Sequence, residues 1–203
     1  MALQTFVKIS QINSLTDARY GAGMGVNLMG FQLEPTHPNY VALPKAQEIA
    51  SWVTGVQWVA EFETLPNSAE WKAYPIDLVQ VSKPEMLAFF QAENQPLILK
   101  ITVENATQLS QALALMEKLH LQVRYFLLES QTLPLSEPLL TTLANICQRY
   151  AVLLAFRFSP ETVKGILEQI KPAGIALESV PEEKVGLKTL DNLIEVLEVL
   201  ETD

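Results

Sequence analysis

Short apolar runs alternate with amphipathic segments along the whole chain. The runs are rich in β-branched and aromatic residues, as buried strands are, whereas the segments between them repeat apolar residues at helical spacing. The pattern therefore predicts a regular succession of strands and helices. Eight strands are predicted, over Phe6–Ser10, Asn27–Leu33, Val56–Phe62, Asp77–Val81, Leu97–Thr102, Tyr125–Glu129, Ala151–Phe156 and Gly174–Leu177.

Several segments between the strands carry signals for the start of a helix. Ser14 predicts the N-cap of the first helix, and Ser159 before Pro160 predicts the N-cap of another. Two further segments show an apolar face at helical spacing. The residues expected to point inward are Leu109, Ala112, Leu113, Met116 and Leu119 after Asn105, and Leu190, Ile194, Leu197 and Val199 or Leu200 in a last helix from Leu187.

Eight β/α units fill 203 residues without a shift in composition or a long linker. We therefore expect one domain over residues 1–203, of the α/β class, with the closed (β/α)8 TIM barrel as the architecture that matches this count. The alternative is an open, doubly wound parallel sheet, which would be preferred if a weak strand such as Asp77–Val81 did not form.

Composition and charge exclude several kinds of protein. With 49% hydrophobic residues the chain can bury a substantial core, which excludes disorder as its main state. The net charge of −9, without any Lys/Arg run, disfavours nucleic acid and anionic membranes as partners. No segment reaches the roughly 18 uninterrupted apolar residues of a membrane-spanning helix, and the N-terminus does not resemble a secretion signal. We therefore expect a cytoplasmic protein with no membrane or nucleic-acid partner.

Glycine, cysteine and tryptophan restrict the chemistry further. The chain has eight glycines and none from Val56 to Lys164, so no glycine-rich phosphate-binding loop can lie in that range. Cys147 is the single cysteine and has no basic neighbour, which is typical of a small buried group rather than a nucleophile. The three tryptophans, Trp52, Trp58 and Trp71, are expected in the core or in helix packing.

Several motifs follow one another in a familiar order. The chain reads Val7-Lys8-Ile9-Ser10-Gln11-Ile12 at its first strand, Met29-Gly30-Phe31 at its second and Pro38-Asn39-Tyr40 after it. These segments resemble the phosphoribosylanthranilate isomerase family, which has V-K-I-C-G-I, L-G-F and S-P-R-Y there, and the resemblance continues to Gly186-Leu187-Lys188. It implies a single-domain barrel that catalyses an Amadori rearrangement of a phosphoribosylated aromatic amine in tryptophan biosynthesis, without a metal or cofactor.

The resemblance also indicates where the family's catalytic residues would lie. The general base, a cysteine in the family, is Ser10 here; the general acid, an aspartate, is Glu129; and an arginine that holds the substrate is Asn39. A serine hydroxyl needs a partner base, whereas a thiol can lose its proton near neutral pH. The extra methylene of Glu129 moves the carboxyl group by about 1 Å, which can cost about a hundredfold in rate.

The family's phosphate-binding glycines are replaced as well. Glu178 would place a carboxylate near the phosphate, and Arg157 could offset it as a bidentate donor of different geometry. Pro134 and Pro181 each remove a backbone N–H donor from the loops after the sixth and eighth strands. The substrate-binding residues expected from the resemblance or from their place at a strand end are Asn39, Gln80, Arg157, Glu178 and Ser179.

Each candidate also has a structural interpretation, which we favour. The Ser10 hydroxyl can bond a neighbouring strand or water. Glu129 and Glu178 can belong to an ion-pair network across the barrel instead of acting as paired carboxylates in acid–base chemistry. His37, in a loop with prolines on both sides, fits a surface residue better than a substitute base. The cations available to such a network are Lys8, Lys100 and Arg157.

These observations predict a catalytically degenerate or repurposed relative of the family that binds a small ligand at the C-terminal mouth of the barrel, or a protein partner. The alternative is a divergent active isomerase with Glu129 as acid and Ser10 or His37 as base. A third possibility is new chemistry on a neutral or cationic ligand, suggested by Glu61, Glu129 and Glu178 at predicted strand ends. We expect a monomer or homodimer.

Overall fold

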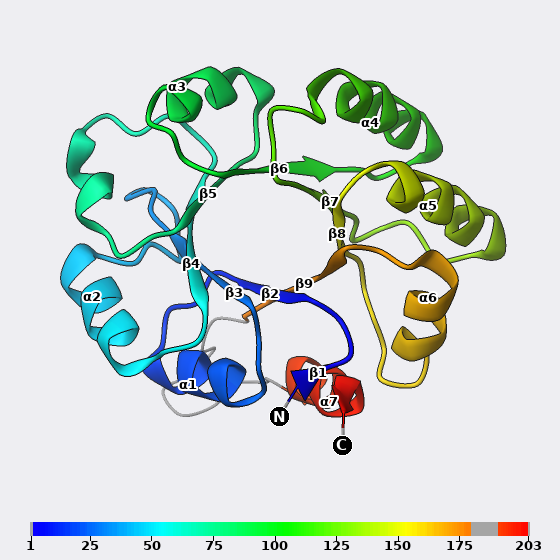
Figure 1. Cartoon of the computed structure of the whole chain (residues 1–203), viewed down its shortest axis with the longest axis horizontal. Coiled ribbons are helices and arrows are strands. Elements are labelled where there is room, and N and C mark those ends of the chain that lie inside the picture. Colours follow the sequence, from blue (N-terminus) through cyan, green and yellow to red (C-terminus); the bar gives the residue numbers. More distant parts are fainter. Residues whose placement is uncertain (1, 180–190, 203) are drawn as a thin grey trace.

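The computed structural model describes residues 2–179 and 191–202, and its centre is a closed barrel of eight parallel strands (Figure 1). Strand β2 pairs with both β3 and β9, which closes the ring. The predicted (β/α)8 barrel is therefore confirmed. The open sheet is wrong, because the weak predicted strand Asp77–Val81 does form, as β5. The strands are β2 (Val7–Ser10), β3 (Leu28–Gln32), β4 (Gln57–Phe62), β5 (Leu78–Val81), β6 (Leu97–Thr102), β7 (Tyr125–Glu129), β8 (Val152–Ala155) and β9 (Gly174–Glu178).

Helices surround the barrel, one after each strand (Figure 1). In the third unit a short 3-10 helix, η1 (Ala69–Ala73), takes the place of an α-helix, and η2 (Pro84–Met86) precedes α3. The α-helices of the described residues are α1 (Leu15–Gly23), α2 (Leu43–Trp52), α3 (Leu87–Ala92), α4 (Ala106–Leu119), α5 (Glu137–Arg149), α6 (Val163–Ile170) and α7 (Asp191–Leu200). No helix in the described ranges is long and apolar enough to cross a membrane.

Both ends of the chain meet on the outside of the barrel. Strand β1 (Ala2–Leu3) pairs antiparallel with β10 (Glu201–Thr202), beside α7 in Figure 1. This small sheet was not predicted, because strands of two residues are too short to show a periodicity. The pairing holds the first and last described segments together.

The predicted helix starts are confirmed in one case and wrong in another. Ser14 Oγ accepts the backbone N–H of Asp17 at 3.2 Å and caps α1 as expected. Ser159 does not cap α6, which begins at Val163; its hydroxyl lies 2.9 Å from Thr162 Oγ1 instead. In α4 the predicted inward residues Leu109, Ala112, Met116 and Leu119 are buried, whereas Leu113 is partly buried. In α7 the buried residues are Leu193, Val196, Leu197 and Leu200, with Ile194 only partly buried, and Leu187 and Leu190 lie outside the described residues.

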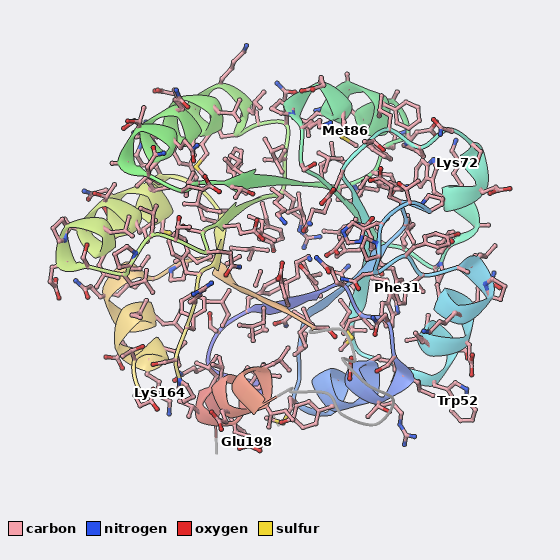
Figure 2. The ribbon with its side chains drawn as sticks, turned by 180° about the vertical axis from the view of Figure 1, so that it is seen from behind. Phe31, Trp52, Lys72, Met86, Lys164 and Glu198 are labelled. Atoms are coloured by element: carbon pink, nitrogen blue, oxygen red, sulfur yellow. The ribbon has the colours of Figure 1, made fainter. Side chains whose placement is uncertain are left out.

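The outward faces of the strands pack against the helices through large side chains. Trp58 stacks on Phe31 with ring centroids 4.4 Å apart, and Trp71 of η1 is buried. Trp52 is 68% exposed on the outer side of α2 (Figure 2), so its predicted place in the packing is wrong. Cys147 is half-buried on α5, and burial raises the pKa of its thiol to about 12, which agrees with an unreactive residue.

Candidate functional site

The barrel interior has an apolar layer to which seven of the eight strands each contribute one aliphatic side chain. On the eighth strand, β2, the position in register with Leu28 and Ala176 is Lys8. Lys8 is completely buried, so a charged group replaces the eighth aliphatic side chain of this layer. The seven apolar residues are Leu28, Val59, Leu78, Ile98, Leu127, Leu153 and Ala176.

Two residues further along each strand, the side chains face the barrel interior again, because side chains alternate between the two faces of a strand. This next layer lies at the carboxyl ends of the strands, the end of a (β/α)8 barrel where active sites occur. It is mainly polar, and Figure 2 shows nitrogen and oxygen atoms gathered inside the ring of strands. We call it the mouth layer: Ser10, Gly30, Glu61, Gln80, Lys100, Glu129, Ala155 and Glu178.

Lys8 bonds two members of the mouth layer. Its ammonium donates to Ser10 Oγ at 2.6 Å and forms a buried ion pair with Glu61 Oε1. The second oxygen of Glu61 accepts the backbone N–H of Gln11 at 3.2 Å, where the chain leaves β2 in a left-handed conformation with φ of 59°. Gly30 makes room for this carboxylate, because a Cβ there would lie 2.0 Å from Glu61 Oε1. The Ser10 hydroxyl is thus bonded within the barrel, but its described partner is Lys8 of the same strand and not the predicted neighbouring strand or water.

Burial lowers the pKa of Lys8, and the charge and hydrogen bond of Glu61 oppose that shift without cancelling it. The nearby Lys100 ammonium lowers the pKa of Lys8 further. The position of Lys8 thus depends on Glu61, since an isolated ammonium would be costly to bury.

A second ion pair occupies the opposite part of the mouth layer. Lys100 Nζ lies 2.9 Å from Glu129 Oε1, and Thr102 Oγ1 donates to the other oxygen of Glu129 at 2.9 Å. Burial lowers the pKa of Lys100, but Glu129 and the more distant Glu178 and Glu61 outweigh burial, so the net pKa is raised. The predicted ion pair of Glu129 is therefore observed, with Lys100, but Glu178 forms no ion pair with a described residue, and Lys8 pairs with Glu61 instead.

Glu178 has no hydrogen bond or ion pair with any residue that the structure describes, although it lies beside Ser10 in the barrel register. Loss of solvent around its carboxyl group raises its pKa, and the charges of Glu129 and Glu61 add to this; Lys100 and Lys8 oppose it. Glu178 is therefore the acidic group of the mouth layer that a ligand can reach and that a proton can neutralise.

Two cavities open at this end of the barrel. The central one is lined by Ser10, Gln80 and Glu61 among others and holds about 20 Å³, which is room for a single water molecule. Gln80, which lines this cavity, has a buried Oε1 without a hydrogen-bond partner in the described part of the chain. The larger one, which we call the mouth pocket, holds about 370 Å³ between the ends of β7, β8 and β9. Only the mouth pocket is large enough for a small organic ligand.

The mouth pocket combines apolar walls with charges of both signs. Phe156, Phe158 and Leu193 line it together with Glu129, Glu178, Arg157 and Gln131. Arg157 Nε donates to Gln131 Oε1 at 3.2 Å, so among the described residues this cation is held by a neutral amide and not by a carboxylate.

Part of the backbone in the loop after β7 cannot donate an N–H to a ligand. Ser130 N–H bonds Ala155 O at 3.0 Å, Leu133 N–H bonds Ser130 Oγ at 3.1 Å, and Pro134 has no N–H. The segment with Val180 and Pro181, where the sequence predicts a lost donor, lies outside the described residues.

Two other candidate residues do not face the mouth layer. Asn39 lies in the loop after β3, where its side chain donates to the side chain of Gln11 and its N–H donates to His37 Nδ1 at 3.1 Å. Ser179 points away from the barrel axis, and its hydroxyl donates to Asp17 of α1 at 2.9 Å. Of the predicted binding residues, the structure thus gathers Gln80, Glu178 and Arg157 at the mouth with Glu129 and Ser10, but not Asn39 or Ser179.

The contact between Lys8 and Ser10 was not predicted from the sequence, and neither was the ion pair between Lys8 and Glu61. The signal was available, because residues two apart on one strand face the same side and Lys8 precedes Ser10 by two. It was not sufficient, since the partner strand that brings Glu61 to Lys8 depends on the stagger of the barrel.

The arrangement defines a (β/α)8 barrel whose carboxyl end, in the described residues, holds two ion pairs, the further carboxylate of Glu178 and the mouth pocket. Among solved structures, the phosphoribosyl anthranilate isomerases of Thermotoga maritima and Thermus thermophilus superpose with TM-scores of 0.74 and 0.73. They are 22% and 23% identical to this chain, and each comparison covers 97% of this chain and 98% of the other. A 3-hexulose-6-phosphate synthase superposes with a TM-score of 0.61 at 14% identity, over 97% of this chain and all of the other.

These similarities confirm the fold that the sequence resemblance implied. The sequence matches no protein-family model and no curated protein. At identities of 14% to 23%, the structural likeness carries the barrel fold, and the chemistry has to be argued from the residues of the mouth.

Proposed function

We propose that this chain is a divergent phosphoribosylanthranilate isomerase-like barrel that does not catalyse the isomerisation and instead binds a neutral or cationic small molecule in the mouth pocket. The observation that carries this proposal is the hydrogen bond from the Lys8 ammonium to Ser10 Oγ. Ser10 stands where the family has its general base, and its described side-chain partner is a cation that can only donate hydrogen bonds. Among the described residues, no base is hydrogen-bonded to this hydroxyl to remove its proton.

The position of the general acid supports the same conclusion. Glu129 is bonded on one oxygen by Lys100 and on the other by Thr102. Each oxygen of this carboxyl group therefore already has a partner within the barrel. Both catalytic positions are thus occupied by contacts within the barrel.

The charges of the mouth favour a different kind of ligand from the family's. One similar isomerase was crystallised with reduced 1-(o-carboxyphenylamino)-1-deoxyribulose 5-phosphate, a ligand with both a phosphate and a carboxylate. Here Lys8 and Lys100 are each bound to a glutamate, which leaves Arg157 to meet an anion in the described part of the mouth. Glu178 faces the same pocket and would repel a phosphate dianion.

A neutral or singly cationic ligand suits the pocket better. Its apolar walls can cover an aliphatic or aromatic group, while Glu178 can accept hydrogen bonds from an amine or a hydroxyl. We also propose a cytoplasmic location and a monomeric or homodimeric state, in keeping with the sequence-based expectation.

The second candidate is a divergent active isomerase with Glu129 as acid and Ser10 or His37 as base. The observation in its favour is that Glu129 lines the mouth pocket and so retains a carboxyl group where the family has its acid. His37 Nδ1 accepts the N–H of Asn39, which leaves Nε2 as the ring nitrogen for proton transfer.

Enzyme assay and genetic complementation distinguish the two candidates. Purified protein is mixed with phosphoribosylanthranilate and the loss of substrate fluorescence is followed, with the Thermotoga maritima isomerase as a positive control. The same pair is tested for rescue of a tryptophan-requiring strain that lacks the isomerase. We expect no turnover and no rescue; turnover in both assays would refute the degenerate function and establish the second candidate.

Ligand class is tested by thermal unfolding in the presence of small amines, neutral polar compounds and phosphate esters. A ligand of the folded state raises the melting temperature by mass action. We expect stabilisation by amines or neutral compounds that is reduced in Glu178→Gln. Stabilisation by phosphate esters alone would overturn the proposed ligand class.

A further inference from the structure

A third cavity lies outside the barrel and separate from the mouth pocket. It holds about 220 Å³ between the loop that follows β3 and the segment that connects β4 to η1. We call it the side pocket. Four aromatic rings form much of its wall, and those of Phe62, Trp71 and Tyr74 are almost completely buried whereas Tyr40 is 37% exposed.

Two polar atoms of the residues that line the side pocket are buried without a hydrogen-bond partner among the described residues. Glu34 receives a hydrogen bond from Thr64 on Oε1 at 2.8 Å, but its Oε2 is buried without a partner in the described residues. The indole Nε1 of Trp71, a side chain only 4% exposed, is also buried without a partner there. Buried polar groups normally make hydrogen bonds, so one acceptor and one donor in the same pocket point to a ligand with complementary groups.

The charge of the pocket decides the sign of that ligand. Glu34 and Glu70 line it, and its described lining contains no lysine or arginine. The adjacent Lys72 projects from the outer rim of the molecule (Figure 2) and is bound to Glu93, with its ammonium 5.8 Å from the centroid of the Trp71 ring. Aromatic faces together with a carboxylate are the surroundings in which proteins bind organic ammonium ions.

We propose that the side pocket binds a small organic ammonium ion that also carries a hydrogen-bond acceptor. The ammonium group bonds Glu34 Oε2 between the aromatic rings, and the acceptor takes the N–H of Trp71. The volume lies below the range of about 300–1,000 Å³ of typical ligand pockets, so the ligand is smaller than a drug-sized molecule. This site is independent of the mouth pocket and of the function proposed for it.

The probes are tyramine, which has an ammonium group and a phenolic oxygen, its neutral analogue 4-ethylphenol, and the anion 4-hydroxyphenylacetate. Binding to the full chain is measured by isothermal titration calorimetry. We expect tyramine to bind, 4-ethylphenol to bind about tenfold more weakly or less, and the anion to show no binding. Absence of tyramine binding at millimolar concentration, or equal binding of 4-ethylphenol, would overturn the proposal.

Variants locate the site. Glu34→Gln removes the charge with little change in shape and should weaken tyramine binding by about tenfold. Trp71→Phe removes the N–H and should weaken it about two- to tenfold, whereas Trp52→Phe, at an exposed tryptophan, should leave it unchanged. Should Trp71→Phe not fold, Glu34→Gln decides. Glu178→Gln is the control for the mouth pocket. If Glu178→Gln lost tyramine binding while Glu34→Gln bound tyramine as the original protein does, tyramine would lie in the mouth pocket and the side-pocket proposal would be refuted.

Discussion

Replacing Lys8 by methionine should strongly destabilise the protein. The methionine fills the space of the lysine stem in the apolar layer but removes the ammonium that bonds Glu61 and Ser10. Glu61, which is 3% exposed, is then left as a buried carboxylate with one remaining described bond, from the N–H of Gln11. Breaking one partner of a buried ion pair costs about 3–5 kcal/mol. We expect about 3 kcal/mol for Lys8→Met, because the Gln11 bond remains.

The double variant Lys8→Met with Glu61→Leu separates the value of the pair from the cost of an orphaned charge. Replacing a buried ion pair by apolar residues of similar volume is often neutral or stabilising by about 1–4 kcal/mol. Here Gln11 N–H loses its acceptor, which offsets that gain by about 1–3 kcal/mol. The double variant should therefore lie close to the original protein in stability, and clearly above Lys8→Met.

Glu61→Leu alone adds a pH dependence with a definite sign. Without Glu61, burial lowers the pKa of Lys8 further below its ordinary value of 10.5, so the unfolded state binds more protons than the folded one. The stability of Glu61→Leu should consequently rise as pH increases toward 10.5, more steeply than that of the original protein. Urea unfolding followed by circular dichroism at several pH values measures all three variants. A loss below about 1 kcal/mol for Lys8→Met, or a double variant less stable than both single ones, would refute this account of the pair.

Three further predictions follow from individual contacts. Gly174→Ala should destabilise the protein by about 1–3 kcal/mol, since its Cβ would lie 2.3 Å from the Phe6 carbonyl oxygen. Gly165→Ala, in helix α6, should stabilise the protein by about 0.5–1 kcal/mol, because a Cβ there would meet nothing within 4 Å. The same urea assay measures both variants. Glu178→Gln should raise the melting temperature near pH 7. The pKa of Glu178 is higher in the folded protein than its ordinary value of 4.5, so ionisation of this group destabilises the folded state as pH increases above 4.5. Glutamine does not ionise, and the gain should therefore vanish below pH 4.5. Cys147, with a pKa of about 12 instead of 9.0, should react with Ellman's reagent at pH 8 about a thousandfold more slowly in the folded protein than in urea; equal rates would contradict the burial of its thiol.

The order and number of the strands could be predicted because parallel strands buried on both faces read as continuous apolar runs. Predicted and observed strands agree within one or two residues, as for Asn27–Leu33 against Leu28–Gln32. The sheet of β1 and β10, the 3-10 helix in the third unit and the exposure of Trp52 depend on tertiary contacts that leave no periodic signal in the sequence.

The mouth could be predicted in composition but not in its pairing. Alternation along a strand places Lys8 and Ser10 on one side, and Glu61, Glu129 and Glu178 at strand ends are visible in the sequence. Which lysine meets which glutamate depends on the stagger between neighbouring strands, and only the structure shows that Lys8 bonds Glu61 while Lys100 bonds Glu129. The side pocket was missed because its walls come from two loops and a 3-10 helix, whose conformations follow from packing.

The chain has a glycine in the segment that resembles the isomerase family's L-G-F, but none in the loops after β7 and β8. Gly30, in the segment that resembles the family's L-G-F, is required by the interior, because any Cβ there would collide with the carboxylate that pairs with Lys8. The glycines of the phosphate loops would serve only a ligand, by letting backbone N–H groups approach it, and the loops after β7 and β8 contain none. The sequence thus has the glycine that the buried ion pair needs and, in the loops after β7 and β8, lacks those that a bound phosphate would need. This contrast supports the proposed function, in which the mouth pocket takes a neutral or cationic ligand and not a phosphate ester.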